Sequence, residues 1–402
     1  MTAYRFTLAE LSGALADLGV MLPLVLALIT LNGVDATGAF VGIGLAYLVT
    51  ALAYRLPIPV QPLKSVSAVA LALGLSARIV VAAAWWNAAL FLLMAWTRAD
   101  RLIARLFPRP VVRGIQLGLA VLLGRSAWSL ISASDAVWPG DVIIAGATIP
   151  WVWLIGAGTL TVLLLALRWW PDWAGLAAIL FGVTLAVIHN GLPSSSFTFS
   201  LPALASVIPH QSELWQALWL LAVPQIPLSL ANSVFATADA ARQYFGVQAG
   251  HVSPRRLMTT MGINNTLVAL VGGVPVCHGC GGLTAHYRLG ARTRGAPLML
   301  GVGFLALGVL GGETLLPLLR LIPFPTLGVL LAYVGFQHML LARDLRGWRE
   351  WSPALLIALI TFHTGNLAIG AALGIVIHFG IRGLNTMSAH LRLRGATNEG
   401  ID

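Results

Sequence analysis

Long apolar runs, separated by short polar stretches, recur along the whole 402-residue chain. Many runs approach the ~20 residues that an α-helix needs to cross the hydrocarbon core of a bilayer. The pattern predicts an all-α polytopic membrane protein with about 14 transmembrane segments, several of them short or broken. Their approximate spans are 8–31, 38–54, 57–75, 79–96, 110–125, 150–167, 173–189, 213–238, 254–272, 274–288, 296–312, 321–341, 352–364 and 366–382.

The polar stretch after the seventh segment divides the segments into two sets of seven. It contains turn-forming residues and no Lys or Arg. Because seven is odd, the two sets must have opposite orientations in the membrane, which makes an inverted repeat, as in many secondary transporters. We therefore expect a first repeat over 1–190, a connecting loop over 191–212, a second repeat over 213–385, and a short cytoplasmic tail over 386–402 without a regulatory domain.

A short internal match supports this repeat. Pro59–Ser65 in the third segment resembles Pro275–Gly281 in the tenth, 216 residues later. The same offset places Asp17 in the first segment opposite Ser233 in the eighth. The match gains weight because each stretch lies in the same ordinal segment of its half.

Composition and charge agree with a membrane protein. Apolar residues make up 58% of the chain and charged residues only 9%, whereas soluble domains carry about 25% charged residues. The net charge of +10 does not indicate nucleic acid, because 20 of the 24 basic residues fall in loops and tails that the segment map places on one side. By the positive-inside rule that side is cytoplasmic. We expect a bacterial inner (plasma) membrane protein with both termini in the cytoplasm.

The third and tenth segments are predicted to be broken half-helices. Pro57, Pro59 and Pro62 open the third segment, and a helix interior does not accommodate prolines at this spacing. We expect extended backbone followed by a helix from about Leu63. The tenth segment is rich in Gly and Pro over 272–282 and predicts the same form. Extended backbone at this depth is tolerated only against protein or a water-filled cavity.

Two half-helices that enter from opposite sides bring their N-termini together near the membrane midplane. Free N–H donors and a partial positive charge at each N-terminus suit a dianion. We expect the anion to contact backbone amides at 65–67 and 279–282. The alternative is that the prolines and glycines only kink the helices so that they pack tightly. The predicted binding residues are Gln61, Lys64, Ser65, Ser67, Gln225, Asn232, Ser233, His278, Gly279, Cys280, Gly281 and Gly282.

Ionisable groups inside membrane segments are costly and therefore functional candidates. Lys64 begins the half-helix of segment three, where it contacts the anion or forms an ion pair with Asp17. Asp17 would titrate if a proton accompanies the anion. His278 is interpreted as an anion donor or a pH sensor. The amides and hydroxyls of segment eight serve the anion or hydrogen-bond between helices.

The stretch Cys277-His278-Gly279-Cys280 does not predict a metal site or a cofactor. A haem-attachment motif would need His at 281, where Gly stands, and no second Cys pair completes a structural zinc site. An intramembrane enzyme would need a nucleophile, a base and an orienting group at one depth. The sequence offers neither an acidic metal cluster nor a His-Glu-x-x-His motif. We therefore expect no enzyme activity.

These motifs resemble those of the molybdate transporter family, which is related to the sulfate permease (SulP) superfamily. The matching stretches are Glu10–Gly19, Pro59–Ser65, Pro224–Ser233, Pro275–Leu283 and Tyr287–Arg292. The resemblance implies a core domain of segments 1–4 and 8–11 and a gate domain of segments 5–7 and 12–14, with the substrate between half-helices three and ten. The chain departs from the family pattern at Ala16, where Gly is usual, and at Cys280, where a small residue is expected.

The expected function is secondary transport of a tetrahedral oxyanion, molybdate first, by alternating access of the core against the gate. Sulfate transport, an anion channel and a nucleobase permease of the same fold are the alternatives. Nucleobase permeases use Glu in segments eight and ten, but here segment ten has no carboxylate and segment eight has only Glu213 at its outer end. The expected partners are the oxyanion and the lipid bilayer, not nucleic acid. Co-transport of a proton or cation, and a homodimer, are left open.

Overall fold

The computed structural model describes residues 4–15, 18–99, 105, 107–132, 141–144, 147–171, 174–193, 199–202, 208–288, 290–311, 317–318, 321–367 and 369–382. Elements of the first half are α1 (Leu8–Leu15), α2 (Leu18–Asn32), α3 (Ala36–Ala53), β1 (Gln61–Pro62), α4 (Lys64–Leu73), α5 (Ala77–Thr97), α7 (Arg109–Ser132), β2 (Asp141–Ile144), β3 (Ala147–Pro150), α8 (Trp151–Trp169) and α9 (Ala174–Asn190).

The second half contains the remaining elements. They are α10 (Gln211–Ala217), η3 (Leu218–Ala222), α11 (Val223–Leu228), η4 (Ser229–Ala236), α12 (Thr237–Phe245), η5 (Gly246–His251), α13 (Pro254–Leu270), β4 (Val276–Cys277), α14 (Cys280–Arg288), α15 (Gly295–Gly311), α17 (Phe324–Leu340), η7 (Leu341–Asp344), α18 (Gly347–Thr364) and an apolar helix over Ile369–Arg382. The elements η3 and η4 are π-helical, and η5 and η7 are 3₁₀-helical.

The expectation of a helical membrane protein is confirmed. Within the described residues, six helices are long and apolar enough to cross a bilayer. Shorter apolar helices, among them α4 and α9, accompany them. The count of fourteen segments stays a prediction. The hairpin β2–β3 was not expected from the helical pattern, and the β-branched run Val142–Ile144 accounts for it because such residues favour strands.

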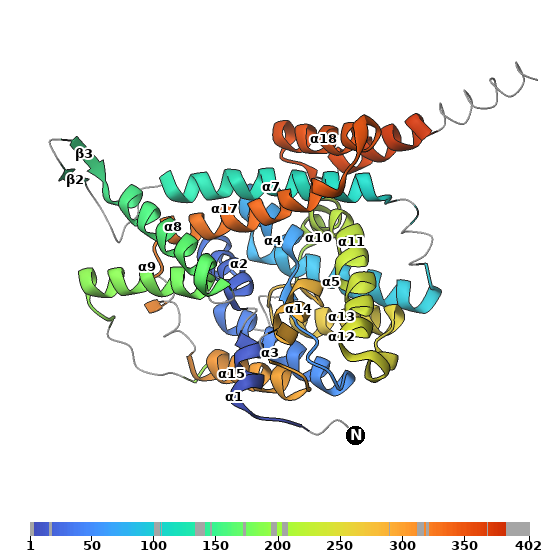
Figure 1. Cartoon of the computed structure of the whole chain (residues 1–402), viewed down its shortest axis with the longest axis horizontal. Coiled ribbons are helices and arrows are strands. Elements are labelled where there is room, and N and C mark those ends of the chain that lie inside the picture. Colours follow the sequence, from blue (N-terminus) through green and yellow to red (C-terminus); the bar gives the residue numbers. More distant parts are fainter. Residues whose placement is uncertain are drawn as a thin grey trace, which may run out of the picture.

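The helices pack in two groups (Figure 1). In the first group, α3 packs against α13 and α15, α13 packs against α5, and α1 contacts α14 and α15. In the second group, α7 packs between α17 and α18, while α8 contacts α9 and α17. Figure 1 shows α7, α17 and α18 along the top of the view and most of the first group below them. The groups meet where α4 and α11 contact α7 and where α2 contacts α9 and α17.

Small residues allow the closest helix contacts. A Cβ atom at Gly44 of α3 would lie 2.9 Å from the carbonyl oxygen of Gly301 on α15. A Cβ at Gly328 of α17 would likewise lie 2.8 Å from the carbonyl oxygen of Ala127 on α7. Membrane helices associate mainly through such close packing, because lipid offers no hydrophobic driving force between helices.

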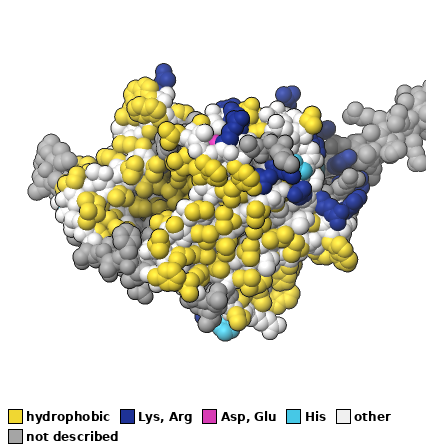
Figure 2. Space-filling model, turned by 90° about the horizontal axis from the view of Figure 1, so that it is seen from below, with side chains coloured by type: hydrophobic (Ala, Val, Ile, Leu, Met, Phe, Trp, Pro, Cys, Tyr) yellow, Lys and Arg dark blue, Asp and Glu magenta, His cyan; other side chains and the backbone are white. Residues whose placement is uncertain are grey.

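Large apolar side chains cover much of the outer surface. Leu52, Trp96 and Val302 are 70%, 78% and 60% exposed. Figure 2 shows apolar side chains across the middle of one face, with Lys and Arg side chains gathered mainly toward one end. In water an apolar surface of this extent would be unfavourable, whereas a bilayer accommodates it.

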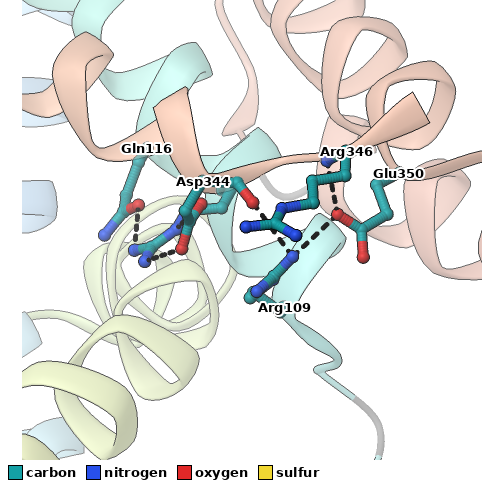
Figure 3. Close-up of polar contacts among 6 residues, drawn as sticks. Arg109, Gln116, Asp344, Arg346 and Glu350 are labelled. Carbon is teal, nitrogen blue, oxygen red and sulfur yellow. Dashed lines mark hydrogen bonds and ion pairs between the residues drawn. The ribbon is translucent and has the colours of Figure 1, made fainter. Parts of the chain in front are cut away.

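A group of charged side chains joins α7, η7 and α18 (Figure 3). The Arg113 guanidinium donates to both carboxylate oxygens of Asp344, at 2.9 and 2.6 Å. Arg109 donates to Glu350 at 2.8 Å. Hydrogen bonds from the Arg346 backbone N–H and from Arg109 hold the pKa of Glu350 below its usual value. Both arginines at the start of α7 therefore have anionic partners within the second group.

Candidate functional site

The two broken segments meet in a short antiparallel sheet. β1 pairs with β4, so that Gln61 lies opposite Cys277 and Pro62 opposite Val276. The Leu63 N–H adds a further bond to the Pro275 carbonyl at 2.8 Å. The predicted order of extended backbone followed by a helix is confirmed in both segments, since α4 begins at Lys64 and α14 at Cys280. The pairing places the two helix N-termini side by side.

A buried amide completes the second edge of β4. The Asn265 side chain on α13 accepts from the Val276 N–H at 3.0 Å and donates to the Val276 carbonyl at 2.7 Å. The side-chain amide thus makes the two hydrogen bonds that a neighbouring strand would make, and it satisfies the N–H and carbonyl of Val276, which lipid could not. The apolar pattern of this segment did not predict the role, although the pair Asn264–Asn265 within it was a usable signal.

His278 braces the two broken segments. Its ring is fully buried, with Nδ1 2.9 Å from the Pro59 carbonyl and Nε2 2.9 Å from the Thr260 hydroxyl. His286 makes a similar contact through Nδ1 to the Pro57 carbonyl. Because both nitrogens of His278 contact the protein, the ring has no nitrogen left for an anion in this structure. Its expected role as a pH sensor stays a prediction.

Gln225 caps the N-terminus of α4. Its Oε1 atom accepts from the N–H groups of Ser65 and Val66 at 3.0 and 3.3 Å, while Nε2 donates to the Ser229 hydroxyl at 2.9 Å. The Ser67 N–H donates to the Leu63 carbonyl. These contacts correct the expectation that the anion uses the amides at 65–67, because the protein itself occupies them. Within the described residues, the buried Ser65 and Ser67 hydroxyls have no hydrogen-bond partner.

The N-terminus of α14 differs because space lies in front of it. A Cβ atom at Gly281 would meet nothing within 4 Å, and this residue is exposed. At Gly279, by contrast, a Cβ would collide with Oε1 of Gln61. Of the neighbouring residues, Cys280 is half-buried and Gly282 is buried. The open approach therefore leads to the first turn of α14 at Gly281.

Segment eight lies beside both half-helices and contains π-helical turns. Asn232 and Ser233 lie in η4, and the Nδ2 atom of Asn232 is 3.7 Å from the Cβ position of Gly279. The Thr237 hydroxyl, at the end of η4, contacts the carbonyls of Asn232 and His278 at 3.0 and 2.7 Å. π-turns frequently occur at functional sites because they redirect side chains. Helical periodicity in the sequence did not predict them.

Lys64 supplies a positive charge at the point where the half-helices meet. It is partly buried and is the first residue of α4, whose N-terminus the β1–β4 pairing places beside that of α14. No carboxylate of the described residues lies within ion-pair distance of it. Its expected partner Asp17 lies outside the described residues, so that pairing stays a prediction.

Comparison with known sequences finds molybdate transporters. The profile described as "Molybdate transporter of MFS superfamily" matches residues 9–123 and 217–337. Molybdate transporter 2 of Arabidopsis thaliana is 28% identical over 432 residues, covering 98% of this chain and 92% of its own. Molybdate transporter 1 of Chlamydomonas reinhardtii is 27% identical, with 92% and 91% coverage.

Solved structures share the fold at lower identity. The transmembrane domain of the cyanobacterium bicarbonate transporter BicA superposes with a TM-score of 0.64 at 14% identity, covering 94% of this chain and 98% of BicA. The murine Slc26a9 anion transporter in its inward-facing state gives a TM-score of 0.71 at 12% identity, with 96% and 69% coverage. The profile match spans more than half of the chain and includes both broken segments, and this protein belongs to the molybdate transporter family.

Proposed function

We propose that this protein is a secondary transporter that carries a tetrahedral oxyanion, with molybdate as its first substrate. The observation that carries the proposal is the open approach to the α14 N-terminus at Gly281, beside a Lys64 that lacks a carboxylate partner among the described residues. The relatives are named as molybdate transporters, and the structural neighbours are named as anion or bicarbonate transporters.

Charge balance fits a dianion. Each helix N-terminus is equivalent to about half a positive charge, and Lys64 adds a full one, so the site offers about two positive charges. The first-turn N–H groups of α14, the Lys64 ammonium and the unpartnered hydroxyls of Ser65 and Ser67 would surround the oxyanion. Asn232 and Gln61 lie next to Gly279 and would complete the lining of the binding site.

The packing supports an inverted repeat with a moving core. In the expected repeat, α2, α3, α4 and α5 of the first half correspond to η4, α13, α14 and α15 of the second. The contact between α3 and α15 then corresponds to the contact between α13 and α5, and the contact between α2 and α4 to the contact between η4 and α14. The β1–β4 and α7–α17 contacts map onto themselves. We assign the first helix group as the core and the second as the gate. Movement of the core, which carries α4 and α14, against α7 would expose the site to each side in turn.

Uptake into proteoliposomes tests the proposed function. We expect saturable accumulation of labelled molybdate, strong competition by tungstate, weaker competition by sulfate, and acceleration by molybdate trapped inside the vesicles. Trans-acceleration would exclude an anion channel. Preferential competition by sulfate would reassign the substrate. Uptake of uracil but not of any oxyanion would mean that the protein is a nucleobase permease instead.

Cysteine labelling tests the proposed orientation, in which both termini are cytoplasmic. Leu192, which follows α9, is 72% exposed, and Arg105 precedes α7 and is also exposed. In a background that lacks Cys277 and Cys280, a membrane-impermeant maleimide should label Leu192→Cys in intact cells. It should label Arg105→Cys only after the membrane is opened. Labelling of both positions in intact cells would contradict the segment map.

A further inference from the structure

The long helix α7 lines two cavities, one at each end, and both lie between the core and the gate. Near its start, Arg109 and Arg113 face Pro227 and Leu230 of segment eight across a cavity of about 260 Å³. Near its end, Arg125 and Ser126 face Leu73 of α4 and His363 of α18 across a cavity of about 440 Å³. In the proposed orientation the first cavity is cytoplasmic and the second, the outer cavity, faces the outside.

The two cavities differ in charge. Both arginines of the cytoplasmic cavity have carboxylate partners, Glu350 and Asp344. Arg125 instead donates to the Phe362 carbonyl at 2.9 Å, and its guanidinium carbon lies 5.5 Å from the centre of the Phe362 ring. No carboxylate is found among the described residues that line the outer cavity. Arg125 is therefore a full positive charge without a carboxylate partner among the described lining residues, and only the partial negative charges at the C-terminal ends of α4 and α18 oppose it.

Arg125 is held in place but not saturated. One of its N–H groups donates to the last turn of α18, whereas a guanidinium has five. The position of the guanidinium over the Phe362 ring adds a cation–π contact. Ser126 and Thr364 donate their hydroxyls to backbone carbonyls of their own helices, so Arg125 is the main donor available to a ligand in the cavity. His363 and Ser129 add polar groups at the exposed rim.

The outer cavity also lies at the far end of the helix that begins at the central site. Leu71, Ala72 and Leu73 at the end of α4 line it, and α4, which is ten residues long, begins at Lys64. At ~1.5 Å per residue the two ends of α4 are about 15 Å apart. Leu73 also touches the gate directly, since its Cδ2 atom is 3.3 Å from the Cβ position of Gly365. The cavity is thus the outer end of the core–gate boundary.

We propose that the outer cavity is a collecting site for the tetrahedral oxyanion, in which Arg125 attracts and holds the dianion before the core opens to it. This inference rests on the proposed function and orientation. The negative ends of the α4 and α18 dipoles border the cavity and oppose tight binding. Weak binding suits the role, because an ion on a transport path must also leave each site.

Transport kinetics at two ionic strengths test the proposal. In right-side-out vesicles at about 10 mM salt, where charges act over about 30 Å, Arg125→Gln should raise the half-saturation concentration for molybdate about tenfold, within the range known for electrostatic steering. At about 1 M salt, where the range falls to about 3 Å, the difference should vanish. Arg125→Lys should resemble wild type, and maximal velocity should not change.

Two further variants separate this role from its alternatives. Arg78→Gln removes another arginine assigned to the outer side, one paired with Glu213 and absent from the cavity lining, and should leave the kinetics unchanged. Ser129→Asp adds a carboxylate at the rim without altering Arg125 and should reproduce the defect, even if Arg125→Gln proves unstable.

Each outcome decides between the ideas. Equal effects of Arg78→Gln and Arg125→Gln would overturn the proposal in favour of general surface charge. If Arg125→Gln raised the half-saturation concentration also in high salt and lowered the melting temperature, Arg125 would have only a structural role, as a cap on the C-terminus of α18. Normal kinetics in both Arg125→Gln and Ser129→Asp would overturn the collecting site and leave the proposed function intact. Absence of saturable oxyanion uptake in wild type would instead overturn the proposed function itself.

Discussion

Gly281→Val is expected to abolish molybdate binding while the protein still folds and inserts. The side chain would occupy the open space in front of the first turn of α14, where a Cβ atom meets nothing within 4 Å. The added Cβ would disturb no protein contact, but an anion could no longer reach the N–H donors. We expect an affinity loss of at least about 100-fold, which corresponds to about 2.8 kcal/mol.

Binding should be measured by equilibrium dialysis on purified protein, together with the melting temperature. Gly303→Val is the matched control, because Gly303 on α15 also has no atom within 4 Å of its Cβ position but lies away from the half-helices. Gly279→Ala provides the opposite contrast, since its Cβ would collide with Gln61 and should lower the folded yield. Wild-type affinity in Gly281→Val would place the anion elsewhere.

Gln225→Glu should also remove oxyanion binding, by a different route. The two side chains have the same shape, so the carboxylate can accept the same two N–H bonds from Ser65 and Val66. A negative group at the N-terminus of α4 is favoured by the helix dipole, and Lys64 begins the same turn. The protein should therefore remain folded. Its own carboxylate would repel a dianion, at about 4 kcal/mol for two unit charges 4 Å apart at an effective dielectric constant of 20.

We expect Gln225→Glu to bind molybdate at least about 100-fold more weakly, with an unchanged or higher melting temperature. Gln225→Ala separates charge from capping. It leaves two buried N–H groups without a partner, which costs about 1–3 kcal/mol each, so its main effect should be on stability. If Gln225→Glu bound molybdate as well as wild type, the anion could not lie at the N-terminus of α4.

The sequence predicted what depends on local backbone chemistry. Pro57, Pro59 and Pro62 cannot continue a helix, and this is why extended backbone before α4 was predicted and is confirmed. The membrane character and the family likewise followed from apolar runs and motifs. The inverted repeat and the segment count stay predictions, because the six long apolar helices of the described residues do not establish them.

Other features of the site depend on partners far apart in the chain. Gln225 caps Ser65 across 160 residues, and His278 contacts Pro59 across 219. Periodicity reports only which face of a helix is apolar, so it could mark Gln225 and His278 as unusual but not identify their partners. The sequence therefore left Gln225 open between the anion and hydrogen bonds to other helices, and His278 open between an anion donor and a pH sensor, whereas the structure gives both side chains bonds within the protein. The anion-binding roles of Lys64 and Gly281 stay predictions.

The two-residue sheet between β1 and β4 has a consequence for biogenesis. During synthesis, the ribosome releases the first strand into the membrane more than 200 residues before its partner is made. Until then, the Leu63 N–H lacks its acceptor at Pro275, and hydrocarbon provides no substitute. The insertion machinery or neighbouring helices must shelter this edge while the second half is translated. A truncated chain that ends before the tenth segment would keep an unsatisfied strand in the bilayer, a feature by which membrane proteases could distinguish it from the finished protein.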